Sequence, residues 1–236
     1  MKICIVGDIH GTTKWHECYQ KIKNNDNDCD KIIVCGDWFD PYENISLDTM
    51  IERYHEFITD MNNDDRIISL IGNHDIDGYV IDGETNRTYR DNMSRRRVSD
   101  EISSNLCNSY LVYKIGNWLF SHAGVSQDWF DNIGENKNII LSNKKGWTPE
   151  ELNSLCRFYF MDFSGYGNSS RQGCTWIRPQ ALMNNHIKGY NQVIGHTRLE
   201  KITNLRDIDS DLDIELWLVD NCGKPEYLTL EIEGCE

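Results

Sequence analysis

The chain has 236 residues, 39% hydrophobic and 26% charged, a composition that fits one large globular domain with a substantial core. Its formal net charge of −14 opposes nonspecific binding to nucleic acid or to an anionic membrane surface, so we expect neither as a partner. No apolar stretch approaches the ~20 residues of a membrane span, and nine scattered cysteines without a CxxC pair favour a reducing, cytoplasmic location.

Strands and helices alternate in the first third of the chain. Residues 2–6 and 31–35 are apolar runs that favour strands, and a third run begins at Arg66. Apolar residues recur at helical spacing over 15–22 and again from Ser46 to Met61. Such alternation predicts a parallel sheet with right-handed crossovers, so the loops after these three strands should share one edge of the sheet.

The rest of the chain is less regular. Residues 108–121 are typical of a β-hairpin with its turn at Gly116-Asn117. Residues 125–190 show no strong strand signal, and we interpret them as a mainly helical and loop excursion over the active edge of a single domain, 1–236. Further predicted elements are a helix ending near Leu106, helices at Pro149–Met161 (capped by Thr148) and Pro179–His186, and strands at 192–194, near 214–219 and at 226–232.

Polar side chains gather where the apolar runs end. The first three runs are followed by GDIHG, GDWFD and GNHD, the hairpin ends in SHAG, and the strand at 192–194 is followed by GHT. One histidine at a strand end is more often a hydrogen-bonded packing residue, and Asn or Asp in a turn often bonds its own backbone. Five such ends together, at the edge where open α/β sheets bind ligands, predict a functional site.

Read in order, these five blocks resemble those of the calcineurin-like metallophosphoesterase superfamily, and the resemblance runs from Asp8 to His196. SHAG, TWIRP at 175–179, VIGHT at 193–197 and the ending LVDNCGKPEYLTLEI are similar to the phosphoprotein phosphatase branch. That branch includes bacterial and phage Ser/Thr phosphatases and symmetrical diadenosine tetraphosphate hydrolases. The resemblance implies an α/β fold, a four-layer αββα sandwich of two mixed β-sheets flanked by helices.

The resemblance also implies a site for two divalent metal ions. Two ions about 3.5–4 Å apart supply a bridging hydroxide as nucleophile and neutralise the phosphoryl oxygens. Mixed imidazole, carboxylate and amide ligands suit manganese, iron or zinc better than calcium. We expect manganese in assays, with iron or zinc as alternatives in the cell. The implied ligands are Asp37 as the bridge, Asp8 and His10 at one ion, and Asn73, His122 and His196 at the other.

Three further residues receive roles from the resemblance. His74 resembles the general acid that protonates the leaving oxygen, and Asp40 matches the carboxylate that orients this histidine and favours its protonated form. Arg178 lies where the family places an arginine on the substrate phosphate. The structural alternatives are a turn residue before Pro41 for Asp40 and a surface arginine at a helix start for Arg178.

The chain departs from the branch at two positions. In that branch the second block usually continues as Asp-Arg-Gly, but here Pro41-Tyr42 follow Asp40. An arginine usually precedes the third block, but here Ile71 stands at that position. Residues 87 to 97 include five arginines, and a run of charged residues most often forms the solvent-exposed face of a helix. The candidates to replace the missing arginines are Arg87, Arg90 and Arg171.

These observations predict a dimetal phosphoesterase acting on phosphomonoesters, with a phosphoprotein as the leading substrate. The alternative within the same chemistry is hydrolysis of dinucleoside polyphosphates. A nucleic-acid phosphodiesterase fits less well, because of the net charge and because Arg198 follows GHT where a second histidine is expected. The rival of another class is a scaffold or phosphate-binding protein that keeps the fold without catalysis.

Overall fold

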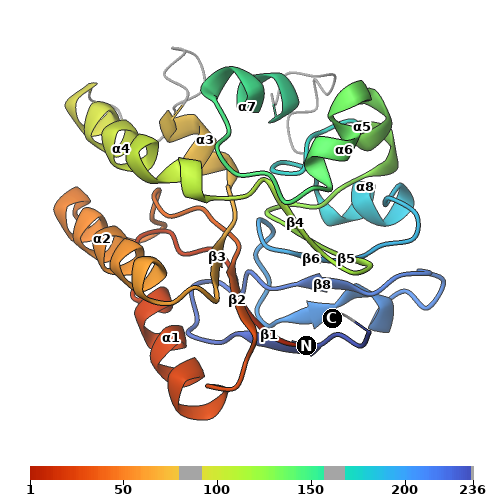
Figure 1. Ribbon diagram of the computed structural model, residues 1–236, viewed down its shortest axis with the longest axis horizontal. Coiled ribbons are helices and arrows are strands. Elements are labelled where there is room, and N and C mark those ends of the chain that lie inside the picture. The colour runs from red at the N-terminus through yellow and green to blue at the C-terminus, as the bar shows by residue number, and fades with distance from the viewer. Residues whose placement is uncertain (80–91, 157–167, 235–236) are drawn as a thin grey trace.

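The computed structural model describes residues 1–79, 92–156 and 168–234 of the chain (Figure 1). Two β-sheets face each other, and helices cover their outer sides (Figure 1). This arrangement confirms the predicted four-layer sandwich. In the described part of the chain, no helix is long and apolar enough to cross a membrane.

The first sheet has the strand order β3-β2-β1-β9. Its members are β1 (Lys2–Val6), β2 (Lys31–Val34), β3 (Ile67–Ser69) and β9 (Leu228–Glu231). The first three strands are parallel, as their alternation with helices predicts, and β9 runs antiparallel to β1.

The second sheet has the strand order β4-β5-β6-β8-β7. Its members are β4 (Val112–Ile115), β5 (Trp118–Ser121), β6 (Asn191–Ile194), β7 (Thr203–Asn204) and β8 (Leu216–Leu218). The hairpin β4–β5 turns at Gly116, whose φ of 55° lies in the left-handed region that favours glycine. Strands β5, β6 and β8 are parallel, whereas β7, which the sequence did not predict, is antiparallel to β8.

The helices lie outside the sheets (Figure 1). They are α1 (Lys14–Asn25), α2 (Leu47–Asn63), α3 (Asn73–Tyr79), α4 (Asn92–Asn105), α5 (Gln127–Asn132), α6 (Lys137–Ile140), α7 (Pro149–Cys156) and α8 (Pro179–Asn184). Short 3-10 turns occur at Leu106–Asn108, Gly134–Asn136 and Leu205–Asp207. Thr148 caps α7 as predicted: its hydroxyl accepts the N–H of Glu151 (3.2 Å), and the Glu151 carboxylate accepts the N–H of Thr148 (2.9 Å).

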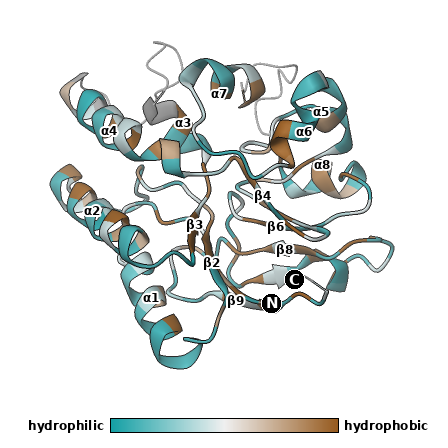
Figure 2. Ribbon diagram, in the orientation of Figure 1, coloured by the Kyte–Doolittle hydropathy of each residue, from teal (hydrophilic) through white to brown (hydrophobic). Residues whose placement is uncertain are grey.

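Strands β1, β2 and β3 are buried on both faces, which explains their largely apolar sequences, whereas Thr229 and Glu231 of the edge strand β9 are exposed. Ile3 and Ile5 of β1 belong to the cluster between the two sheets, together with Phe120 of β5. Cys4 and Val6, on the opposite face of β1, belong to the cluster under α1 and α2. Figure 2 shows this division as hydrophobic strands between helices that are polar on the outside.

Some boundaries differ from the sequence prediction. Helix α7 is described only to Cys156, and the predicted remainder to Met161 lies outside the described residues. Helix α8 ends at Asn184, two residues before the predicted end at His186. The two last strands do not pair with each other: the DNCGKP turn carries the chain from β8 in the second sheet to β9 in the first.

Candidate metal centre

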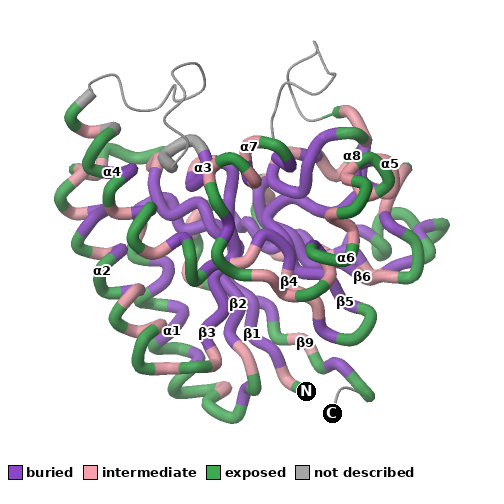
Figure 3. Tube along the Cα trace, turned by 45° about the horizontal axis from the view of Figure 1, so that its top comes forward, coloured by how far each residue is buried: buried purple, intermediate pink, exposed green. Residues whose placement is uncertain are grey.

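The five polar blocks converge where the carboxyl ends of parallel strands from both sheets meet. Asp8 and His10 follow β1, Asp37 follows β2, Asn73 and His74 open α3 after β3, His122 follows β5, and His196 follows β6. Figure 3 shows the buried strands continuing into buried loops at this edge. The third block is therefore the first turn of a helix, whereas the sequence suggested only a polar stretch after a strand.

Potential metal ligands form two groups that share one carboxylate. Asp8, His10 and Asp37 place one ligand atom each within 4.8 Å of one another, and so do Asp37, His122 and His196. Asp37 is thus the residue common to both groups, and its side chain is buried. Asn73 joins the second group, because its Oδ1 lies 2.9 Å from Nε2 of His122.

Backbone carbonyls orient two of the histidine rings. His10 Nδ1 lies 2.8 Å from the carbonyl oxygen of Asp40, and His122 Nδ1 lies 2.7 Å from that of Cys35. A carbonyl oxygen only accepts, so each Nδ1 carries the proton that is donated. Nε2 of His10 then points to the carboxylates of Asp8 (3.9 Å) and Asp37 (3.8 Å). Ligating histidines are typically held in this way.

Two polar atoms in this cluster lack hydrogen-bond partners among the described residues. They are Oδ1 of Asp8 and Nε2 of His196, and both are buried. Buried polar atoms are normally satisfied, because leaving one unpaired is energetically costly. A cation between these groups would supply the missing partner. The donor set therefore fits a pair of divalent ions.

The backbone of the site is held in uncommon conformations. His10, Asp37 and His196 have φ values of 47°, 50° and 61°, which non-glycine residues rarely adopt. Such strain persists only where the surrounding structure fixes it, and it concentrates at functional sites. Glycines provide the necessary space: a Cβ atom on Gly72 would lie 2.0 Å from Oδ1 of Asp37, and one on Gly195 would lie 2.0 Å from Oδ1 of Asp8.

Charge in the cluster is balanced internally. Burial opposes ionisation of His122, but the carboxylates of Asp37 and Asp8 outweigh it and raise its pKa to about 10. Burial also opposes ionisation of Asp37, but His122, whose Nε2 lies 3.2 Å from Oδ2, holds the pKa of Asp37 below its usual range. Burial raises the pKa of Asp8 and lowers those of His10 and His196.

Metal binding is therefore expected to release protons. With a pKa of about 10, His122 is protonated in the metal-free protein at neutral pH, so it would have to lose a proton in order to hold an ion. Affinity for Mn²⁺ should rise with pH by roughly tenfold per unit for each proton released. Calorimetry between pH 6 and 8, in buffers of different ionisation enthalpy, measures the affinity for Mn²⁺ and the number of protons released. Affinity independent of pH would contradict this description of His122.

His74 and Asp40 form a pair beside the buried cluster. Nδ1 of His74 lies 2.8 Å from Oδ2 of Asp40, and both side chains are about one-quarter exposed, unlike the buried potential ligands. The backbone N–H of His74 donates to Oδ1 of Asp37 (2.9 Å), which fixes the pair relative to the cluster. This geometry joins the two residues that the sequence predicted as acid and partner. An imidazole placed in this way is suited to proton transfer at the solvent side of the site.

Arg178 lies on the His196 side of the cluster. Its guanidinium donates to the carbonyl oxygen of His196 (3.2 Å) and to Oγ1 of Thr197 (3.1 Å). Burial lowers its pKa, and the carboxylates of Asp8 and Asp37 are close enough to act against that shift. Of the other predicted arginines, Arg171 is exposed in the loop before Cys174, and Arg87 and Arg90 lie outside the described residues.

The sequence prediction gave no role to three buried charged groups. The Asp75 carboxylate accepts the backbone N–H groups of Asp37 (2.9 Å), Trp38 (3.0 Å) and Gly72 (2.8 Å), and so joins the second block to the third. Asp220 follows β8 and lines the same pocket as Asp8 and His10, with a buried Oδ2 that has no partner among the described residues. The signal for Asp220 was present, because it too is an acid after an apolar run. Lys14 is fully buried on α1 and its charge acts on Asp8.

Solved structures resemble the chain in fold at low sequence identity. A cold-active protein-tyrosine phosphatase of a psychrophile Shewanella species has a TM-score of 0.59 and 17% identity, over 98% of this chain and 75% of that one. A metallophosphoesterase from Sphaerobacter thermophilus (TM-score 0.48, 14% identity, 98% and 84% covered) and a serine/threonine phosphatase from Saccharomyces cerevisiae (0.46, 14%, 93% and 66%) are also similar. No curated protein sequence matches the chain.

The family model for calcineurin-like phosphoesterases matches residues 1–197. The match contains all five polar blocks, and the family implies two divalent ions, for which the groups around Asp37 provide the donors. The chain therefore belongs to the calcineurin-like phosphoesterase family and is a metal-dependent phosphoric ester hydrolase.

Proposed function

We propose that this protein is a Ser/Thr-type phosphoprotein phosphatase that hydrolyses phosphomonoesters at a dinuclear metal centre. The observation that supports the metal chemistry of this proposal is the position of Asp37, which belongs to both groups of potential ligands. A carboxylate shared by two neighbouring sites is what a metal pair requires. In this proposal Asp37 would be shared by two ions, of which Asp8 and His10 would hold one, and Asn73, His122 and His196 the other.

When bound, the ions supply a nucleophile from water at neutral pH and positive charge for the phosphoryl oxygens. The protein's residues supply the remaining steps. His74, oriented by Asp40 at 2.8 Å, donates a proton from its ring to the leaving oxygen of the ester. Arg178, next to His196, binds a phosphoryl oxygen through its guanidinium and thereby orients the ester for in-line displacement.

A substrate panel tests the proposal. The purified protein is supplied with Mn²⁺ and given phosphoserine and phosphothreonine peptides, a phosphotyrosine peptide, an aryl phosphomonoester, an aryl phosphodiester and diadenosine tetraphosphate. We expect the highest kcat/KM on the phosphoserine or phosphothreonine peptides and weak activity on the diester. Preferential hydrolysis of the phosphotyrosine peptide or of diadenosine tetraphosphate would overturn the substrate assignment but keep the metal chemistry.

The scaffold alternative predicts a different outcome of the same panel. A protein that has lost catalysis would bind two Mn²⁺ ions and hydrolyse none of these substrates. The proposal predicts turnover of at least the aryl monoester, because the ligand set and the His74–Asp40 pair are both present.

A further inference from the structure

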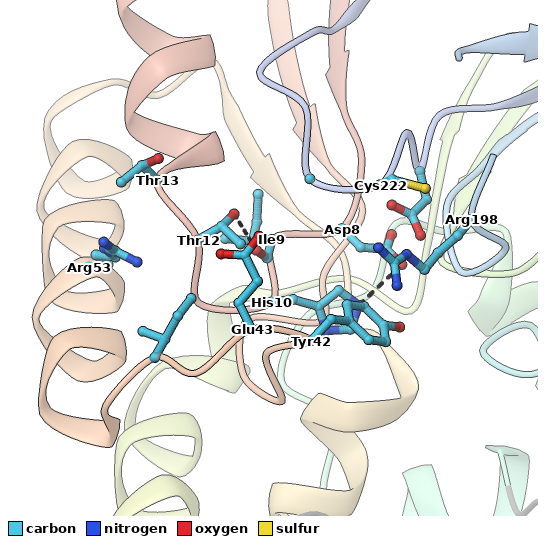
Figure 4. A pocket seen from close by; sticks show the side chains of 13 residues that line it. Asp8, Ile9, His10, Thr12, Thr13, Tyr42, Glu43, Arg53, Arg198 and Cys222 are labelled. Atoms are coloured by element: carbon cyan, nitrogen blue, oxygen red, sulfur yellow. Dashed lines mark hydrogen bonds and ion pairs between the residues drawn. The ribbon is translucent and has the colours of Figure 1, made fainter. Parts of the chain in front are cut away.

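A pocket of about 250 Å³ opens beside the candidate metal centre. Asp8 and His10 line one part of it, and Tyr42 and Arg198 line the same pocket (Figure 4). Neither Tyr42 nor Arg198 has a role in the function proposed above. The two residues come from distant parts of the sequence: Tyr42 from the loop after β2 and Arg198 from the loop after β6.

Arg198 presents an unpaired guanidinium in this pocket. The group lies over an aromatic ring, with its central carbon 3.8 Å from the centroid of Tyr42. Within the described residues it makes no hydrogen bond and no ion pair, so its five N–H donors remain available. In a chain with a net charge of −14, an arginine without a carboxylate partner is available to bind an anion.

Tyr42 determines where this guanidinium lies. Its ring contacts that of His10 edge-on, with the centroids 4.5 Å apart. The same ring also contacts the guanidinium of Arg198. The phenyl ring is thus a spacer between a potential metal ligand and the arginine. Figure 4 shows Arg198 extending from its loop toward Tyr42, on the side of the pocket where Asp8 and His10 lie. Tyr42 itself is 58% exposed, so the surface of the pair is accessible to a substrate.

Two arginines therefore flank the centre from different sides. Arg178 lies next to His196 and donates to its carbonyl oxygen. Arg198 lies on the His10 side, where it contacts the ring of Tyr42, which in turn contacts His10. A phosphomonoester that is a dianion offers more charge to such a pair than a diester, which carries a single negative charge. Guanidinium groups match phosphate oxygens in geometry and can bind two of them at once.

We propose that Arg198 binds the phosphate of the substrate and that Tyr42 is the positioning residue for its guanidinium. Together, Arg198 and Tyr42 select dianionic phosphomonoesters over diesters. This inference rests on the proposed phosphatase function. It adds the residue that binds the phosphate on the His10 side and names the charge state of the ester that is preferred.

The test uses inorganic phosphate as the probe, both as a ligand of the Mn²⁺-loaded protein in calorimetry and as an inhibitor of aryl phosphate hydrolysis. Arg198→Ala should weaken phosphate binding by about 10- to 100-fold, the range for a hydrogen bond to a charged group, and raise KM similarly. The Mn²⁺ stoichiometry should not change. Arg198→Lys, which keeps the charge without the planar fork, should recover part of the loss. Arg206→Ala is the matched control, since Arg206 is an exposed arginine that pairs with Glu215 (3.2 Å) and does not line the pocket.

Tyr42 is tested by two substitutions. Tyr42→Ala removes the ring and should raise KM in the same direction as Arg198→Ala, with a smaller effect on kcat. Tyr42→Phe keeps the ring and should restore the affinity that Tyr42→Ala loses. The ratio of monoester to diester activity should fall in both Arg198→Ala and Tyr42→Ala.

The outcomes separate this inference from the function on which it rests. If the wild-type protein hydrolyses monoesters and Arg198→Ala binds phosphate within about twofold of it, the inference is wrong and the function stands. If the wild-type protein hydrolyses no monoester, the proposed function fails. The calorimetric comparison of phosphate binding then still decides whether Arg198 is an anion-binding residue.

Discussion

Replacing Asp37 by asparagine is expected to abolish binding of the metal pair and, with it, hydrolysis. The amide keeps the shape of the side chain, and its oxygen can still accept the backbone N–H of His74, which lies 2.9 Å away in the wild-type protein. It cannot provide the negative charge that both groups of ligands share. The loss in Mn²⁺ affinity should exceed the roughly 10–100-fold that follows removal of a group that only supports a ligand. Metal content after gel filtration and kcat/KM on an aryl phosphate measure the two effects.

The control for this variant is Asp131→Asn, which removes a carboxylate that is 56% exposed and pairs with Lys137 at the surface. It should retain both the metal content and the activity of the wild-type protein. Circular dichroism establishes that Asp37→Asn is folded before the comparison is made. An Asp37→Asn protein that is folded and still holds two ions would rule out Asp37 as the bridge.

Replacing His74 by asparagine is expected to lower kcat by about 10²–10⁴-fold while the metal content stays near that of the wild-type protein. The proton donated by the imidazole is needed only as the leaving oxygen acquires charge in the transition state, so KM should change little. The loss should be larger for an alkyl ester such as phosphoserine than for an aryl ester with an acidic leaving group. That dependence on the leaving group distinguishes proton donation from a structural role.

His16→Asn is the matched control, because His16 is an exposed histidine on α1. Its kcat should equal that of the wild-type protein with both esters. Equal losses for the alkyl and aryl esters in His74→Asn would show that His74 does not donate the proton. A loss of metal ions would instead indicate that it supports the ligands.

Much of this site could be predicted from sequence, because its residues follow apolar runs at the ends of strands. The alternation of strands and helices places Asp8, Asp37 and Asn73 at one edge of a parallel sheet, as the structure shows. His122 and His196 also stood out at strand ends, and the resemblance to a family then gave them the role of metal ligands from the second sheet. Their proximity to Asp37 depends on how the two sheets face each other, which local sequence patterns do not encode.

The remaining features depend on contacts between distant loops. Arg198 was considered only as a departure from a histidine, and Tyr42 only as a departure from a glycine. Their contact requires the loops after β2 and β6 to lie side by side, although the residues are far apart in sequence. The left-handed conformations of His10, Asp37 and His196 were also not predictable, since none of these residues favours a positive φ as glycine does.

The most direct test of the dinuclear centre is an anomalous-difference map from crystals of the Mn²⁺-loaded protein. We predict two peaks about 3.5–4 Å apart, on either side of the Asp37 carboxylate. One peak should lie beside Asp8 and His10, and the other beside His122 and His196. A single peak, or two peaks that do not share Asp37, would contradict a metal pair bridged by this residue.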